Sequence, residues 1–202
     1  MLDRMVINLL RPSLDCAARR LAACGTRADA VTWVGFAIGL GAAGAIASRH
    51  FAFGLALMLV SRLCDGLDGA VARQTAPTDR GAFLDITLDF LFYASVPLAF
   101  AVADPAANGF AASVLLAAFI GTGSSFLAFA ALAAKRGITS VVYPRKGIYY
   151  LGGLTEASET VICFGAMCIW PVAFAGLAYG FAVLCLLTLV TRLWSGWKAL
   201  GA

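Results

Sequence analysis

The segment that decides the fold reads Asp65-Gly66-Leu67-Asp68-Gly69-Ala70-Val71-Ala72-Arg73, then seven residues, then Gly81-Ala82-Phe83-Leu84-Asp85-Ile86-Thr87-Leu88-Asp89. Its four aspartates lie in two stretches that are otherwise apolar. A carboxylate inside a membrane helix costs at least about 2.5 kcal/mol unless it has a partner or a function. We therefore expect the rest of the chain to be arranged around these four groups.

The composition is that of an integral membrane protein. Of the 202 residues, 61% are hydrophobic and only 13% are charged, which is too apolar for a soluble globular domain. The apolar residues form long continuous runs, so we expect a bundle of spanning helices and not a β-barrel. The net charge of +4 comes without a basic, aromatic-rich block, and no nucleic-acid partner is expected.

We predict an all-α, polytopic membrane protein that forms one domain over residues 1–202. Residues 1–27 alternate apolar and basic side chains and are expected to form an amphipathic helix on the membrane surface. A six-helix bundle then occupies residues 31–192. The expected spans are Val31–Ser48, Phe51–Arg73, Gly81–Ala103, Gly109–Ala134, Leu151–Cys168 and Val172–Arg192.

Basic residues gather on one side of the predicted bundle. They lie in the N-terminal segment, in two connections and in the C-terminal tail, whereas the opposite connections contain only Arg49. By the positive-inside rule, both termini and the aspartate-containing ends of the helices face the cytosol.

Counting along the second and third spans predicts how the aspartates meet. At 1.5 Å per residue, Asp65 and Asp89 lie about 12 Å from the shared connection, and Asp68 and Asp85 about 6 to 8 Å. The spacings of three and four residues put each pair on one helix face. Like charges this close require cations, and carboxylates without Cys or His favour Mg²⁺, Mn²⁺ or Ca²⁺. Four of them are enough for two ions, which with Arg73 at the mouth suggests chemistry on a phosphate.

The motif resembles the signature of the CDP-alcohol phosphotransferases, a family of six-helix membrane enzymes. It is the pattern Asp65-x-x-Asp68-Gly69-x-x-Ala72-Arg73 followed by Gly81-x-x-x-Asp85-x-x-x-Asp89, although seven residues separate Arg73 from Gly81 where the family usually has eight. Further segments resemble a bacterial inner-membrane branch of the family. They are Phe119–Phe129, Tyr149–Glu156 and Thr191–Gly196.

The resemblance implies transfer of a substituted phosphate, usually phosphatidyl from CDP-diacylglycerol, to an alcohol, with release of CMP in phospholipid synthesis. It implies a cytosol-facing site, one or two Mg²⁺ or Mn²⁺ ions and a homodimer, and the count of carboxylates above favours two ions. Metal ligands by motif position are Asp65, Asp68, Asp85 and Asp89. Asp89 would also take the acceptor's proton as the catalytic base. The CDP pocket would include Gly69, Ala72 and Arg73, with Asp29 and Thr32 matching a further family pattern.

Several other charged residues have two interpretations each. Arg62 would bind substrate or pair with a carboxylate, and Glu156 and Glu159 would contact the acceptor or neutralise Arg62. Four basic residues would form an anion pocket for a phosphorylated acceptor, although the positive-inside rule explains them without a substrate. They are Lys135, Arg136, Arg145 and Lys146.

Two other classes of function stay open from the sequence. Carboxylates in spanning helices also mark ion paths, so a divalent-cation transporter is the main alternative. Against a transporter, the aspartates lie only in the cytosolic half of the membrane. No acidic residue continues the path outward except Asp104, which is in a loop. A non-catalytic scaffold is the third possibility, and the intact set of four aspartates disfavours it.

Overall fold

The computed structural model describes residues 2–137 and 155–201, with side chains from residue 9 onward. Within these residues the secondary structure is entirely helical, as the sequence predicts. The elements are α1 (Leu2–Ala23), α2 (Ala28–Ala47), α3 (Phe51–Gln74), α4 (Asp79–Ala103), α5 (Pro105–Lys135), α6 (Ala157–Ile169), the short 3-10 helix η1 (Pro171–Ala173) and α7 (Phe174–Gly201).

Side-chain caps set several of the helix starts. Thr78 accepts a hydrogen bond from the Gly81 amide at 3.0 Å and begins α4. Asp104 accepts from the Ala107 amide at 3.1 Å and begins α5, where Pro105 occupies the first turn. Such caps satisfy amide groups that have no partner within the helix. The boundaries of the site-bearing helix α4 are therefore determined locally.

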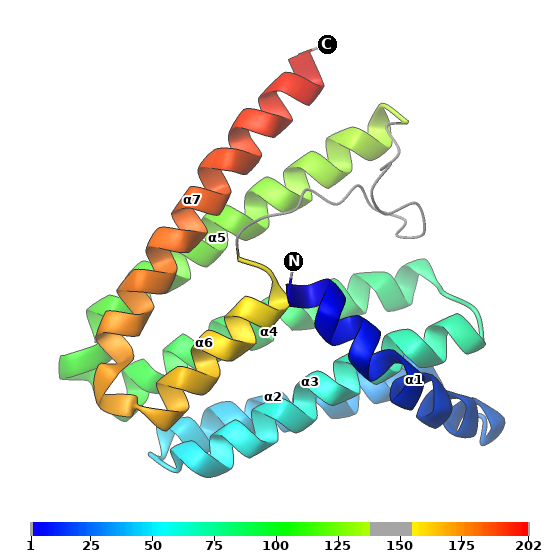
Figure 1. The fold of residues 1–202 in the computed structure, drawn as a ribbon, viewed down its shortest axis with the longest axis horizontal. Coiled ribbons are helices and arrows are strands. Elements are labelled where there is room, and N and C mark those ends of the chain that lie inside the picture. The colour runs from blue at the N-terminus through cyan, green and yellow to red at the C-terminus, as the bar shows by residue number, and fades with distance from the viewer. Residues whose placement is uncertain (1, 138–154, 202) are drawn as a thin grey trace.

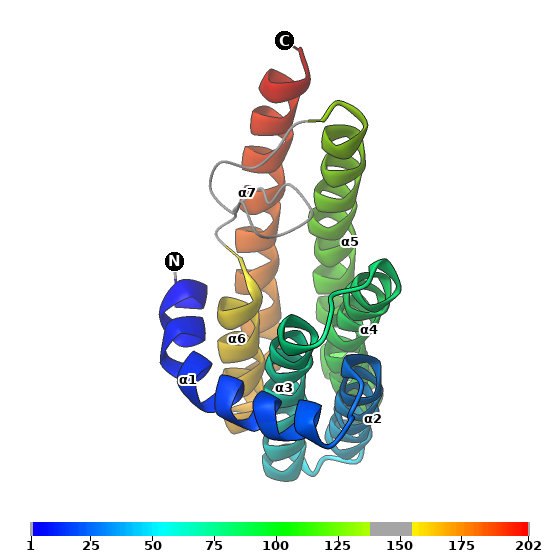
Figure 2. The same ribbon diagram turned by 90° about the vertical axis from the view of Figure 1, so that its right-hand side faces the viewer.

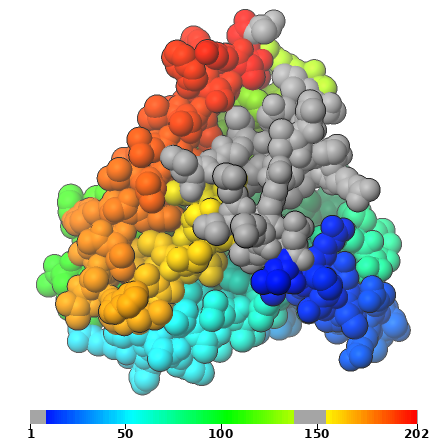
Figure 3. Space-filling view, viewed as in Figure 1, coloured from blue at the N-terminus to red at the C-terminus, as the bar shows by residue number. Residues whose placement is uncertain are grey.

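The helices form two groups joined at one end. In the first, α2 packs against both α3 and α4; in the second, α5 packs against α7, and α4 contacts α5. Figures 1 and 2 show α5 and α7 running side by side and extending beyond the other helices at the end where the chain terminates. Helix α6 touches α3 and α7, and Figure 3 shows it filling the space between them.

An aromatic core holds the two groups together. The Phe51 and Phe174 rings stack on the two sides of Phe100, with centroid distances of 5.6 and 4.5 Å. Phe100 lies near the C-terminal end of α4 and Phe174 at the start of α7. This aromatic core lies near the C-terminal end of α4. The polar groups, including Asp85 and Asp89, lie toward the N-terminal end of the same helix.

Glycines allow α2 to approach α3 and α4 closely. A Cβ atom at Gly39 would lie 2.7 Å from Phe92 Cδ2 and 2.9 Å from Ser61 Oγ, and one at Gly35 only 2.8 Å from Cys64 Cβ. The Ser61 hydroxyl donates to the Gly35 carbonyl at 2.8 Å across the same interface. Small residues at helix interfaces are typical of membrane bundles.

The structure supports the membrane assignment but not the full count of six spans. Among the described residues, four helical segments are long and apolar enough to span: α2, α4, α5 and the η1–α7 segment. Helix α6 has 13 residues, a rise of about 20 Å against about 30 Å of hydrocarbon. The predicted fifth span began at Leu151, and residues 151–154 lie outside the described part of the chain. Helix α3 matches its predicted span but carries several charges.

The N-terminal segment forms helix α1, in line with the helix predicted for residues 1–27; Pro12 lies inside this helix, and Figure 2 shows that the helix is bent. Its C-terminal half packs on α3, where Ala18 is fully buried with Ala70 and Val71. Asp15 lies 3.7 Å from Arg11 and 4.0 Å from Arg73, so α1 also contacts the basic end of α3. Its place on a membrane surface stays a prediction.

The close approach at Gly39 predicts a sharp difference between two glycines of α2. Gly39→Ala should lower the free energy of unfolding by about 1–3 kcal/mol, because the buried Phe92 ring cannot move aside without strain. Gly44→Ala is the matched control, since nothing lies within 4 Å of its added Cβ. Thermal unfolding in detergent measures both, and equal melting temperatures for the two variants would contradict the packing described.

Candidate active site

Three aspartates converge where α3 and α4 face each other. One carboxylate oxygen from each of Asp65, Asp68 and Asp85 lies within 4.8 Å of the others. The helical spacing had predicted this: Asp65 and Asp68 share a face of α3, and Asp85 approaches from the antiparallel α4. Asp89 lies one turn further along α4 and is not part of the three-residue group.

The three-aspartate group fits a divalent cation. Asp68 is 4% exposed, and its Oδ2 atom is buried without a hydrogen-bond partner. A buried carboxylate oxygen without a donor is costly, and a hard cation would satisfy it. The group contains only oxygen ligands, which suits Mg²⁺ or Mn²⁺.

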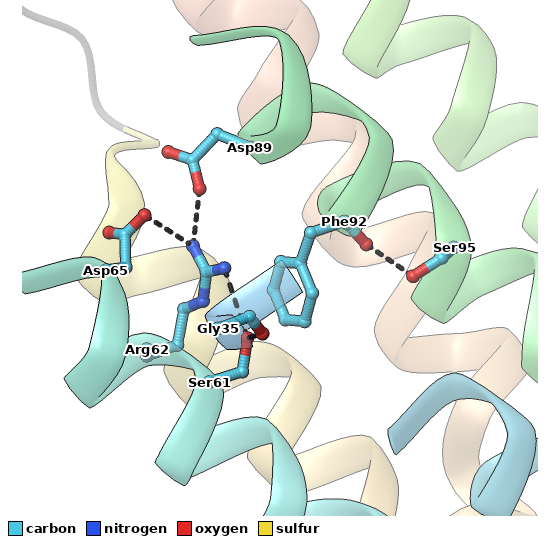
Figure 4. Close-up of polar contacts among 7 residues, drawn as sticks. All are labelled: Gly35, Ser61, Arg62, Asp65, Asp89, Phe92 and Ser95. Carbon is cyan, nitrogen blue, oxygen red and sulfur yellow. Dashed lines mark hydrogen bonds and ion pairs between the residues drawn. The ribbon is translucent and has the colours of Figure 1, made fainter. Parts of the chain in front are cut away.

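Arg62 lies between the two deeper aspartates. Its Nη1 atom donates to Asp89 Oδ1 at 2.5 Å and lies 3.6 Å from Asp65 Oδ1. The guanidinium carbon lies 3.8 Å from the centroid of the Phe92 ring, and Figure 4 shows Arg62 directed at both carboxylates beside this ring. Of the two interpretations of Arg62, the structure therefore shows pairing with carboxylates, and the partners are aspartates, not Glu156 or Glu159.

A cavity of about 450 Å³ opens beside the aspartates, between the α1–α2 connection, α3 and α4. Asp68 and Asp85 form its inner wall. Of the residues expected at a CDP pocket, four line this cavity: Asp29, Thr32, Gly69 and Ala72. The carboxylate of Asp29 pairs with Arg80, which also lines it.

Arg73 is not among the residues that line the cavity. Its side chain is 55% exposed and lies 4.0 Å from Asp15 of α1. A Cβ atom at Gly69 would lie 3.4 Å from Arg73 Nη1, so the guanidinium adjoins one lining residue. The structure thus places Arg73 beside the cavity and not within it.

A second hollow, of about 530 Å³, adjoins the first between α2 and α4. The two share Arg27, Asp29 and Arg80, and the second adds the rings of Trp33 and Phe83. These rings are 54% and 70% exposed. The polar cavity therefore continues into an apolar surface between two helices.

A third cavity, of about 200 Å³, lies on the other side of Asp89. Its polar lining comes from α4, α5, α6 and α7 and from the two residues that precede α6. The polar lining residues are Asp89, Tyr93, Thr122, Thr155, Glu156, Thr160 and Arg192. Arg192 is 9% exposed and donates through Nη1 to the Thr122 carbonyl at 3.0 Å.

Sequence reasoning had counted Arg192 only as a basic residue of the tail. The signal that could have found it is the group Thr188, Thr191 and Arg192, which interrupts the apolar run of α7 at helical spacing.

The remaining expected acceptor residues are scattered. Glu156 lines the third cavity, whereas Glu159 accepts a hydrogen bond from the Glu156 amide at 3.2 Å and completes a capping box at the start of α6. Lys135 and Arg136 are exposed at the far end of α5, and Arg136 Nη1 donates to the Leu200 carbonyl at 2.6 Å. Neither lines the three cavities. Arg145 and Lys146 lie outside the described residues.

Comparison with known proteins identifies related sequences over nearly the whole chain. Residues 26–194 match the CDP-alcohol phosphatidyltransferase family. The inner membrane protein YnjF of Escherichia coli is 50% identical over 200 residues, which is 99% of this chain and 97% of the relative. An archaetidylinositol phosphate synthase of Methanothermobacter thermautotrophicus is 39% identical over 95 residues, 45% of this chain and 47% of the relative.

The fold is also that of solved structures. Mycobacterium tuberculosis phosphatidylinositol phosphate synthase with CDP-DAG bound superposes with a TM-score of 0.72 at 24% identity, over 91% of this chain and 93% of that one. The same synthase in complex with manganese and citrate gives the same TM-score and identity, over 91% and 88%. At this identity the likeness establishes the helical architecture.

The buried Asp68 oxygen predicts a measurable cation affinity. Asp68→Asn should weaken Mn²⁺ binding by the purified protein at least about tenfold, because a charged ligand is lost from the group. Asp79→Asn removes the same charge from the exposed first turn of α4 and should leave binding unchanged. Equal affinities for the two variants would show that the cation binds elsewhere.

Proposed function

Because the chain belongs to the CDP-alcohol phosphatidyltransferase family, we propose that it transfers a phosphatidyl group from CDP-diacylglycerol to a small alcohol and releases CMP. The family membership makes it a transferase of phospholipid metabolism. The donor, the metal and the acceptor are proposals that rest on the site.

The observation that carries the proposal is the pair of cavities on opposite sides of the aspartates. The larger one reaches Asp68 and Asp85, and the smaller one reaches Asp89. Between them a narrow space of about 10 Å³ is lined by all four aspartates and Arg62. A transferase needs two substrates to meet at one reacting centre, and this arrangement allows each to approach from its own side.

The larger cavity suits the nucleotide part of the donor. Arg27 and Arg80 supply positive charge for phosphates, and Gly69 and Ala72 leave room at the helix surface. The adjoining apolar hollow with Trp33 and Phe83 favours a lipid-linked donor over a water-soluble one, because an acyl chain would leave the cavity there toward the lipid. Arg73, beside Gly69, would contribute to phosphate binding at the edge.

We assign Asp65, Asp68 and Asp85 as ligands of Mg²⁺ or Mn²⁺, with Asp89 as the fourth motif carboxylate. The bound cation would neutralise charge on the donor phosphates. Asp89 faces the smaller cavity, so its carboxylate would accept the proton of the acceptor hydroxyl. Four carboxylates are enough for two ions. Arg62 also contacts two of these carboxylates, Asp65 and Asp89, and its positive charge has to be counted with the ions.

The smaller cavity favours a small polyhydroxy acceptor. Its volume of about 200 Å³ is too small for a lipid, and Thr122, Thr155 and Thr160 are among the residues that line it. Arg192 would favour a phosphate on that acceptor, whereas Glu156 would favour a hydroxyl or amine. The exposed Lys135 and Arg136 are better explained by membrane orientation than by acceptor binding.

The proposed location is the bacterial inner membrane, in line with the relative of that description. In this arrangement α3 and α6 complete the six-helix bundle, and both termini and the site face the cytosol. A homodimer, as the family resemblance implies, is part of the same proposal.

A divalent-cation transporter remains the main competing function, since aspartates in membrane helices also form ion paths. Reconstituted protein should give no Mn²⁺ flux into proteoliposomes above that of empty vesicles. Flux that disappears in Asp68→Asn would favour transport over transfer, and a scaffold would show neither flux nor turnover.

The central prediction concerns Asp89. Asp89→Asn should lower the rate of CMP release from CDP-diacylglycerol by about 10²–10⁴-fold, because an amide cannot accept the acceptor's proton. The assay uses purified protein with Mg²⁺ or Mn²⁺ and a panel of polyols, phosphorylated polyols and amino alcohols.

Asp104→Asn serves as the control for that assay. Asp104 caps α5 at the opposite end of the bundle and pairs with Arg49 at 3.7 Å, so activity should be retained. No CMP release from any CDP-linked donor, with metal and every acceptor class present, would overturn the proposed function.

A further inference from the structure

Arg62 occupies the place of a cation within the aspartate set. A single atom, Nη1, faces both Asp89 Oδ1 at 2.5 Å and Asp65 Oδ1 at 3.6 Å. Asp68 and Asp85 group with an oxygen of Asp65. The four carboxylates are thus divided between a three-oxygen group and an arginine pair, with Asp65 belonging to both.

The guanidinium is held in this position from several sides. Its face lies 3.8 Å from the Phe92 centroid and 5.6 Å from that of Tyr93. Nη2 lies 3.4 Å from Ser61 Oγ, whose hydroxyl is itself fixed on the Gly35 carbonyl. The Arg62 side chain is only 14% exposed. A planar, stacked guanidinium with two carboxylate partners is a fixed part of the fold and not a passing surface contact.

Charge balance then limits how many metal ions the site accepts. Two divalent ions would neutralise four carboxylates by themselves, and Arg62 would add a further positive charge in a poorly solvated region. One divalent ion together with Arg62 offsets three of the four negative charges and leaves the phosphates of a donor to be drawn in by Arg27 and Arg80. A second ion would also have to displace the 2.5 Å contact to Asp89.

We propose that the Arg62 guanidinium replaces the second metal ion, so that this chain binds one divalent cation at Asp65, Asp68 and Asp85 and uses Arg62 to position Asp89. The inference rests on the proposed metal-dependent function. Figure 4 shows the second oxygen of Asp89 pointing away from Arg62, which leaves that oxygen for the acceptor hydroxyl. Arg62 is therefore a positioning residue that acts through Asp89.

The experiment counts Mn²⁺ bound to the purified full chain in detergent, by equilibrium dialysis and electron paramagnetic resonance. The wild type should bind one Mn²⁺ per chain with the spectrum of an isolated ion. Arg62→Met keeps an apolar stem against Phe92 and should double the bound Mn²⁺, with a spin-coupled spectrum from two neighbouring ions. Arg62→Lys retains the positive charge and should stay at one ion.

Arg49→Met is the matched control, because Arg49 pairs with Asp104 at the other end of the bundle and its loss should not alter the count. Two coupled ions in the wild type would overturn the inference while leaving the proposed function intact. So would an unchanged count in a folded Arg62→Met. No saturable Mn²⁺ binding by the wild type would overturn both. If Arg62→Met does not fold, the wild-type count and the Arg62→Lys count still decide the matter.

Discussion

Carboxylates placed among apolar helices repel one another unless positive charge separates them, and the bundle depends on meeting that requirement. Arg62 does so for Asp65 and Asp89 within the chain itself. The group of Asp65, Asp68 and Asp85 is left with a buried oxygen that has no donor. Arg62 thus offsets the repulsion between Asp65 and Asp89, whereas the buried oxygen of Asp68 requires a bound cation.

The support for this arrangement comes from close packing and not from further charges. The Phe92 ring that faces the Arg62 guanidinium is backed by Gly39, where a Cβ atom would leave no space. Ser61, next to Arg62, is fixed on the Gly35 carbonyl. Small residues of α2 therefore control the position of a charged side chain on α3, and through it that of an aspartate on α4.

Much of this could be predicted from the sequence. The depths and faces of the aspartates follow from helical geometry, because both helices are regular and share a short connection. The partner of Arg62 could not be chosen, since that depends on how α3 and α4 are rotated relative to each other. The three-residue spacing between Glu156 and Glu159 is that of a capping box, but the same residues could also be interpreted as contacts to the acceptor. The spacing of Thr188, Thr191 and Arg192 marks a polar position on α7, but the cavity that Arg192 lines depends on how α5 and α7 pack.

The six predicted spans show the same division between local and tertiary information. Hydropathy located the helices, yet in the part of the chain that the structure describes only four segments are long and apolar enough to cross the membrane alone. Helix α3 carries the site and α6 is short, so both rely on their neighbours. The site thus joins α4, which hydropathy identifies as a span, to α3, whose charges keep it out of that group.

The two cavities that flank the aspartates also bear on stereochemistry. The space of about 10 Å³ between them is lined by all four aspartates, so under the proposed transfer the donor and the alcohol would be bound at the same time. Such a ternary complex would permit one direct displacement at phosphorus, with the alcohol arriving opposite the departing nucleotide. Inversion of configuration at that phosphorus would then follow, whereas a covalent phosphatidyl-enzyme would give retention.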